Sequence, residues 1–176
     1  MILRCQPAAD AIRAAKEADG YVILLDPAGM PFNQEKAREL SKKDHLVLVC
    51  GHYEGFDARI FHYADEAISL GDFVMTGGEI AAMAVSDAVV RLLPGSIRRE
   101  STEEESFDNG LLEYPQYTKP RDFEGHKVPE VLFSGNHEAV RRWRKEAALE
   151  RTRRQRPELY ERFKEKEARR GEAGEQ

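Results

Sequence analysis

Residues 66–95, EAISLGDFVMTGGEIAAMAVSDAVVRLLPG, decide the fold that this sequence predicts. A short strand comes first, within EAISLGD, and a glycine-containing loop follows it. The helix predicted next, residues 77–95, starts at two glycines and ends at Pro94-Gly95. It is apolar along most of its length, so we expect neighbouring elements to bury it on nearly all sides. A strand, a glycine loop and a long apolar helix in succession indicate an α/β protein.

Two further apolar runs lie upstream and predict two more strands. YVILLDP (21–27) is stopped by Asp26-Pro27, and HLVLVCG (45–51) ends at Gly51. Helices are predicted at 7–18, at 33–43 with Asn33 as N-cap, and at 57–64. Because the strands are continuous apolar runs that alternate with helices, we expect a parallel sheet covered on both faces.

Each predicted strand ends in a loop rich in Gly, Pro or Asp: residues 24–29, 50–55 and 69–78. In open α/β sheets, ligands bind outside the carboxyl ends of the strands. Glycine lets backbone amides approach a ligand without a Cβ in between. The three loops together predict one ligand site at this edge, although the glycines of any single loop are also explained by tight turns alone.

Several common sites are excluded by motif. The loops contain neither GxGxxG nor GxxxxGK[ST], so neither a dinucleotide fold nor a phosphate-binding P-loop is indicated. The histidines show no HExxH or Cys/His ligand spacing, and no metal site is predicted. No apolar run is long enough to span a membrane, and no signal peptide is recognised. Cys5 and Cys50 form no CxxC, which fits a reducing cytoplasm.

Charge is segregated along the chain. The formal net charge is −5, yet residues 141–156 hold eight basic and two acidic side chains, a local charge of +6. Every charged residue in the stretch 100–108 is acidic. Helices are predicted at 136–149 and 157–166, followed by a solvated tail. We therefore expect one domain at 1–98, an acidic mobile linker at 99–115, and a helical RNA-binding domain at 116–176.

Four strings in this order, residues 46–60, 68–95, 105–120 and 128–144, resemble the signature blocks of the TrmD family of tRNA (guanine-N1)-methyltransferases. The resemblance covers roughly residues 7–157. It implies the SPOUT-type α/β fold: a parallel sheet with a deep C-terminal trefoil knot, plus a small all-α C-terminal domain. It also implies a cytoplasmic homodimer that binds tRNA and uses S-adenosylmethionine, with no DNA or membrane partner. The family begins with a further strand and glycine-rich loop, which would precede residue 7.

Carried onto this sequence, the family's cofactor pocket falls on the three strand-end loops. The residues concerned are Leu24, Leu25, Asp26, Pro27, Gly51, Tyr53, Glu54, Gly55, Leu70, Gly71, Asp72, Phe73, Val74, Met75, Gly77 and Gly78. The family's reaction also uses Mg²⁺, with Glu54 as a candidate helper, but residue spacing defines no site for the ion.

The implied reaction is methyl transfer to guanine N1 at position 37 of tRNA, beside the anticodon. N1 carries a proton that a general base must remove, and a cation must stabilise the charge that develops on O6. The family's base is an Asp, where this chain has Glu105; Glu104 and Asp108 are the alternatives. Arg91 matches the family's arginine, and Glu113 stands where another acid contacts the target base, supplied by the partner subunit.

The candidate RNA-binding residues are Asn136, His137, Arg141, Arg144 and Lys145. Trp143 could stack on a base or simply anchor its helix. Three other functions remain open from sequence. They are a folded but inactive cofactor- and RNA-binding module that lacks the N-terminal segment, a knotted enzyme acting on another RNA position, and a metal-dependent phosphoryl enzyme using Asp57, Asp65 and Asp72.

Overall fold

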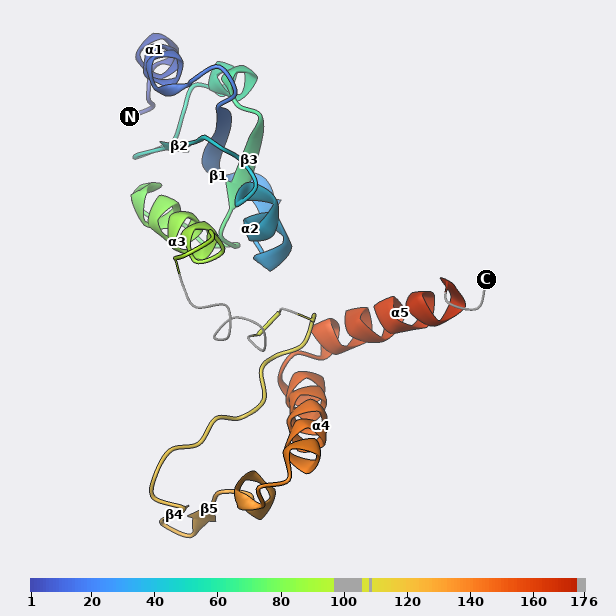
Figure 1. The fold of residues 1–176 in the computed structure, drawn as a ribbon. Coiled ribbons are helices and arrows are strands. Elements are labelled where there is room, and N and C mark those ends of the chain that lie inside the picture. The colour runs from blue at the N-terminus through green and yellow to red at the C-terminus, as the bar shows by residue number, and fades with distance from the viewer. Residues whose placement is uncertain (97–105, 108, 174–176) are drawn as a thin grey trace. The chain divides into compact units, whose positions relative to one another are not determined.

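The computed structural model of the protein describes residues 1–96, 106, 107 and 109–173 (Figure 1). The chain divides into two compact units, residues 1–98 and 99–176. The first unit contains α1 (Cys5–Ala15), β1 (Tyr21–Pro31), α2 (Gln34–Leu40), β2 (Leu46–Cys50), the 3-10 helix η1 (Ala58–Tyr63), β3 (Glu66–Ser69) and α3 (Glu79–Val90). The predicted elements are thus all present in this unit, with bounds that differ by a few residues.

The three strands form one parallel sheet in the order β2-β1-β3. Tyr21 pairs with Leu46 at one end of the β1–β2 ladder, and Leu25 pairs with Cys50 at the other. The mixed α/β class and the parallel sheet predicted from the sequence are confirmed.

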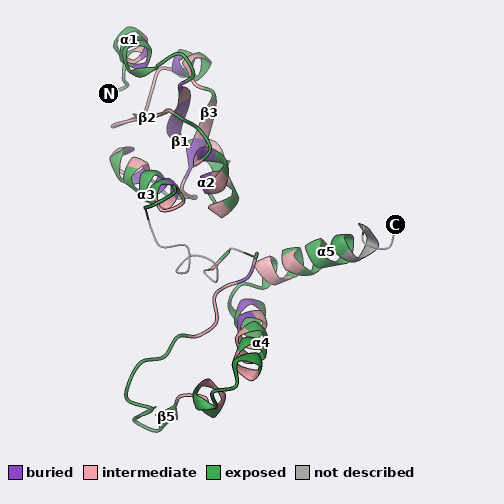
Figure 2. Cartoon of the chain, viewed as in Figure 1, coloured by how far each residue is buried: buried purple, intermediate pink, exposed green. Residues whose placement is uncertain are grey.

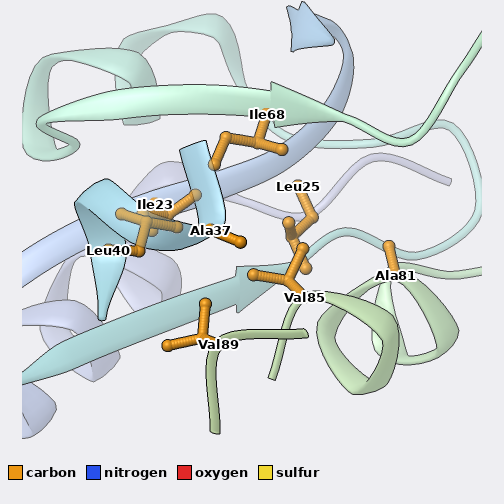
Figure 3. Packing of buried hydrophobic residues seen from close by; sticks show 8 residues of the cluster. All are labelled: Ile23, Leu25, Ala37, Leu40, Ile68, Ala81, Val85 and Val89. Carbon is orange, nitrogen blue, oxygen red and sulfur yellow. The ribbon is translucent and has the colours of Figure 1, made fainter. Parts of the chain in front are cut away.

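Alternate residues of β1 face opposite layers of the unit. Ile23 and Leu25 pack with side chains of α2, α3 and β3, as the close view in Figure 3 shows. Val22 and Leu24 pack against α1 and η1 on the other face. Side chains in a strand alternate between its two faces, so one apolar run serves two hydrophobic clusters. All four of these β1 side chains are buried.

β1 does not stop at Asp26-Pro27, which corrects the predicted strand end. The strand bulges after Leu25 and then resumes pairing with β3, where Met30 pairs with Ile68 and Pro31 with Ser69. Gly29 makes this return possible, because a Cβ at that position would lie 2.4 Å from the Ile68 backbone nitrogen. The backbones of the two strands therefore touch at a point where no side chain fits.

α3 is less buried than its composition predicted. Ala81, Val85 and Val89 face the core, but the exposed fractions of Ile80 (63%) and Met83 (71%) are high. Figure 2 shows the exposed residues along this helix. The expectation of burial on nearly all sides is wrong within this chain, since only one face of α3 meets the sheet.

The second unit contains a two-stranded ribbon, β4 (Asp122–Phe123) with β5 (His126–Lys127), and the 3-10 helix η3 (Glu130–Phe133). Two long helices follow, α4 (His137–Gln155) and α5 (Pro157–Ala173). The predicted all-α description omitted the ribbon, and both helices run past their predicted ends. Charged pairs three residues apart, such as Glu167 with Arg170, support α5 where a tail was expected.

A buried threonine fixes the segment that enters this second unit. Thr152 on α4 has no exposed surface, and its Oγ1 accepts a hydrogen bond from the Leu112 backbone N–H at 2.9 Å. The Arg151 guanidinium donates to the Glu113 carbonyl at 3.0 Å, and the Glu113 N–H donates to Ser106 Oγ. Residues 106, 107 and 109–113 therefore follow a defined path to α4.

Candidate functional site

A cavity of about 270 Å³ lies at the carboxyl ends of β1, β2 and β3. Its walls come from the β1 bulge, the turn after β2, the loop after β3 and the first turn of α3. This cavity, which we call the strand-end pocket, is lined by Leu25, Asp26, Pro27, Gly51, His52, Tyr53, Glu54, Gly55, Ile68, Ser69, Leu70, Gly71, Phe73, Val74, Met75, Thr76, Gly77, Gly78 and Ala81.

The structure brings together every predicted cofactor-site residue except Leu24 and Asp72. Leu24 is fully buried and packs on the opposite face of the sheet. It was included because it belongs to the strand end, but the alternation of β1 turns it away from the pocket. Asp72 is exposed and does not line the cavity.

Five lining residues were not predicted: His52, Ile68, Ser69, Thr76 and Ala81. His52 and Thr76 lie inside loops that the sequence had already marked. Ser69 ends β3, and its neighbour Ile68 pairs with both Leu25 and Met30 across the bulge. Ser69 is also the first residue of the marked loop 69–78, whereas nothing in the sequence marked Ile68 or Ala81 as pocket residues, and the bulge itself was not foreseen.

Gly77 and Gly78 bring the start of α3 against the end of β2. The Gly78 N–H donates to the Gly51 carbonyl at 2.8 Å. A Cβ on Gly78 would lie 2.9 Å from Cys50 Cα, and a Cβ on Gly77 would lie 2.5 Å from the His52 ring. Gly78 requires glycine, because the Cys50 backbone occupies the space of a side chain, whereas a side chain at Gly77 would displace the His52 ring and the Glu79 carboxylate.

The other two walls of the pocket are also shaped by the backbone. After β2, the Gly55 N–H donates to the His52 carbonyl, and both Tyr53 (φ 58°) and Gly55 (φ 94°) adopt left-handed conformations. After β3, Ser69 Oγ accepts from the Gly71 N–H at 3.1 Å. At the bulge, Asp26 Oδ1 accepts from the Ala28 N–H at 2.9 Å. These local hydrogen bonds define the conformations of the three loops.

The charge of the strand-end pocket is negative. Its two ionisable carboxylates belong to Asp26 and Glu54, and its lining includes no Lys or Arg among the described residues. Glu54 is exposed. Burial, and then the nearby Glu79 carboxylate, raises the pKa of the Cys50 thiol behind the pocket. Such a pocket suits a small ligand with positive charge and disfavours a phosphate.

Arg91, the predicted catalytic residue of the first unit, does not line the strand-end pocket. Arg91 is the C-cap of α3, while Ala81 of the same helix lines the pocket; ten residues of helix separate them by about 15 Å. Glu105 and its alternatives Glu104 and Asp108 lie outside the described residues. Glu113 belongs to the second unit, where its Oε1 accepts from Gln116 Nε2 at 2.6 Å.

The five predicted RNA-binding residues lie at the start of α4. Asn136 is the N-cap, and its side chain accepts hydrogen bonds from the Glu138 and Ala139 N–H groups. Arg144 lies with its Cζ 4.7 Å from the centre of the Tyr114 ring. His137, Arg141 and Lys145 are exposed. The structure thus gives Asn136 a capping role and leaves three polar side chains facing solvent.

Two features of the described residues bear on other functions. Within residues 1–96, 106, 107 and 109–173, no three His, Cys, Asp or Glu side chains gather as a metal site would require. In the same part of the chain, none of the helices combines the length and apolar character needed to cross a membrane. Asp57 caps η1 and pairs with Arg59, which lowers the pKa of its carboxyl.

Fold and site together define the class: an α/β protein whose cavity lies where parallel strands end, the usual ligand position of this architecture. The model of the family described as tRNA (Guanine-1)-methyltransferase TrmD matches residues 1–162. The chain therefore belongs to the TrmD family.

Curated relatives agree with this assignment, and each is named tRNA (guanine-N(1)-)-methyltransferase. The relative from Clostridium beijerinckii is 55% identical over 93% of this chain and 69% of its own length. The relative from Dictyoglomus turgidum is 56% identical over 92% of this chain and 66% of its own length. The relative from Malacoplasma penetrans is 52% identical over 91% of this chain and 71% of its own length. The chain thus spans about two thirds of the length of these relatives.

Proposed function

We propose that this chain transfers a methyl group from S-adenosylmethionine to N1 of a guanine in tRNA. One observation carries the proposal: the chain belongs to a family named for this reaction over residues 1–162, and that range includes the strand-end pocket. We further propose, from the resemblance of the linker and C-terminal blocks, that the guanine is at position 37.

The residues of the strand-end pocket fit this methyl donor. S-adenosylmethionine supplies a methyl group on a positively charged sulfonium. A pocket with two carboxylates and no lining cation attracts that charge, and backbone groups around Gly51, Gly77 and Gly78 can approach the ligand closely. The absence of a phosphate-binding motif in the sequence agrees, because this donor carries no phosphate. Leu24 and Asp72 have no part in the proposed pocket.

The acceptor side needs a base and a cation. We assign the base to Glu105, which would take the proton from guanine N1, and we assign to Arg91 the stabilisation of charge on O6. Glu113 would contact the target base. The backbone of Glu113 is held by Ser106 and Arg151, so the segment that leads to Glu105 has one fixed end on α4.

Two features support a homodimer in which these groups meet. Arg91 is remote from the pocket of its own chain, and α3 presents exposed apolar side chains, among them Ile80, Met83 and Val90. A contiguous apolar face of this kind marks an interaction surface. A second copy of the chain packed on this face would bury it and supply Arg91 and Glu113 from across the interface.

The proposed trefoil knot has support in the path of the chain. β3 and β2 lie on opposite sides of β1. Yet the loop after β3 reaches the end of β2, where Gly77 bridges His52 and Gly78 bonds to Gly51. The loop therefore crosses the end of β1 before α3 begins, which is the crossing that a knot at this edge needs. We also propose a cytoplasmic location, where tRNA is found, and assign no site to Mg²⁺.

The proposal is tested by a methylation assay with a tRNA transcript, run beside calorimetry with S-adenosylmethionine. Glu105→Gln removes the base, so turnover should fall by about 10²- to 10⁴-fold while the Kd of the donor changes less than about twofold. Glu100→Gln, in the same acidic stretch, is the matched control and should be near wild type. Normal turnover of Glu105→Gln would refute its role, and donor binding without any transfer by the unmodified chain would favour the inactive module.

A further inference from the structure

A second and larger cavity, of about 870 Å³, lies within the second unit. We call it the aromatic pocket. It is formed by the extended segment 114–121, η3 and the first half of α4, and the proposed methyl transfer does not use it. Its lining consists of Tyr114, Pro115, Gln116, Tyr117, Thr118, Lys119, Pro120, Arg121, Val128, Leu132, Phe133, Val140, Trp143 and Arg144. Its volume lies within the range of small-molecule sites, roughly 300–1,000 Å³.

Aromatic rings dominate its walls. Tyr117 and Trp143 lie with ring centres 6.3 Å apart and their planes inclined by 47°. The exposed fractions of Tyr117 and Phe133 are each 46%, so much of these side chains faces solvent rather than the core. A flat ring that remains half exposed beside a cavity offers its face to another flat ring. Nucleobases are recognised on protein surfaces in this way.

The charge of the lining is positive. Lys119, Arg121 and Arg144 contribute three cations, and among the residues that the structure describes no carboxylate lines the pocket with them. The Arg121 Cζ lies 4.0 Å from the centre of the Phe133 ring, and Arg144 lies over Tyr114. The Phe133 ring orients the Arg121 guanidinium without neutralising it, so the charge of Arg121 still acts on a phosphate. The exposed Arg141 and Lys145 extend the positive charge along α4.

From these contacts we infer that the aromatic pocket binds one unstacked nucleotide of the RNA substrate, other than the guanine that is methylated. The base stacks among Tyr117, Phe133 and Trp143, and its phosphate lies against Lys119 and Arg121. An acidic peptide would use the cations alone and leave the rings without a partner. This inference rests on the proposed function in so far as the RNA is taken to be the tRNA substrate.

Trp143 allows a direct test because it is the only tryptophan of the chain. A five-nucleotide single-stranded RNA should change its fluorescence saturably, and Tyr117→Leu should weaken this binding by about 5- to 100-fold. Phe123→Leu is the matched control, since Phe123 is also exposed, at 61%, but does not line the pocket. Arg121→Gln should likewise weaken binding more than Arg142→Gln, whose arginine is exposed outside the pocket.

Several results would overturn the inference. They are equal losses for Tyr117→Leu and Phe123→Leu, equal binding of an RNA duplex of the same length, and an identical response to inorganic phosphate or to hexaglutamate. The oligonucleotide assay requires neither methyl donor nor transfer. Its failure would therefore leave the proposed methyltransferase intact, and intact oligonucleotide binding with no methylation of tRNA would contradict the proposed function alone.

Discussion

The strand-end pocket and the aromatic pocket are built by different means. The first is shaped by backbone, because Gly77 and Gly78 in its lining, and Gly29 further along β1, stand where a Cβ would collide with a neighbouring strand, ring or carboxylate. The second is shaped by side chains that project from an extended segment and one helix. Their charges are also opposite, two carboxylates in one and three cations in the other.

Because the two pockets are built differently, amino-acid substitutions should affect them differently. A backbone-shaped pocket is part of the folded sheet, so altering its glycines alters the fold itself. A pocket made of side chains on the surface of a unit shares its binding energy among several rings and cations. Single substitutions there should weaken binding in steps and leave the fold intact.

The largest effect is expected from a Gly→Ala substitution, made once in each unit to compare the backbone-shaped pocket with the side-chain pocket. Gly29→Ala places a Cβ 2.4 Å from the Ile68 nitrogen, so we expect a loss of about 3 kcal/mol or more in unfolding free energy, with loss of donor binding. Gly125→Ala meets no atom within 4 Å and bears only the cost of its left-handed φ, about 1 kcal/mol. Urea titration followed by circular dichroism measures both, and equal losses would contradict the contrast.

In the proposed homodimer, the exposed face of α3 contacts the second copy, and methyl transfer at the strand-end pocket depends on that contact. Met83→Glu adds a charge to a side chain that is 71% exposed, so the single chain should fold normally while the dimer dissociates. Methyl transfer should fall at least tenfold, on the scale of one lost charge-stabilising group. Sedimentation velocity measures the oligomeric state. Ala11→Glu, on exposed α1 at the opposite face of the sheet, should remain dimeric, and a dimeric Met83→Glu protein would place the interface elsewhere.

A smaller effect is expected at the buried hydroxyl of α4. Thr152→Val keeps the shape but leaves the Leu112 N–H without its acceptor, at a cost of about 1–3 kcal/mol. The segment that leads to Glu105 loosens, so kcat falls severalfold while the donor Kd is unchanged. Thr152→Ser keeps the hydroxyl and should restore kcat. Identical kcat values for the two variants would show that the hydrogen bond does not position the segment.

The smallest effect concerns the charge behind the strand-end pocket. Burial raises the pKa of the Cys50 thiol, and the Glu79 carboxylate raises it further, so little thiolate is present near neutral pH. Glu79→Gln removes the second cause, which lowers that pKa and should speed alkylation of Cys50 by iodoacetamide by about twofold. Mass spectrometry gives the rate with Cys5 as internal reference. A slower alkylation of Cys50 in Glu79→Gln would contradict the inference that Glu79 raises the pKa of this thiol.

Local sequence chemistry predicted the layers of the first unit well. Continuous apolar runs located the three strands, and Asn33 caps α2 through the Lys36 N–H as its residue type predicted. The strand-end loops were also correctly grouped, because parallel strands place their carboxyl ends at one edge. The error at Asp26 was instructive: its side chain does form the expected local turn, but Gly29 then lets β1 resume along β3.

The features that sequence could not supply depend on contacts between distant residues. The pairing of Thr152 with Leu112 spans forty residues, and no pattern around either one marks it. The aromatic pocket combines segment 114–121 with η3 and α4. The sequence alone therefore did not decide whether Trp143 stacks on a base or anchors its helix. The apolar composition of α3 predicted burial, but composition does not say whether the covering surface belongs to the same chain.

The length of α4 has a mechanical consequence. Trp143 lines the aromatic pocket, and Thr152 holds Leu112 in the segment that leads toward Glu105. Both residues lie on α4, nine residues or about 14 Å apart along one continuous helix. A helix of this length behaves as a stiff rod, so a tilt imposed at one end is delivered to the other. RNA bound at Trp143 would thereby move the segment held by Thr152, so that RNA binding and alignment of this segment would be one coupled movement.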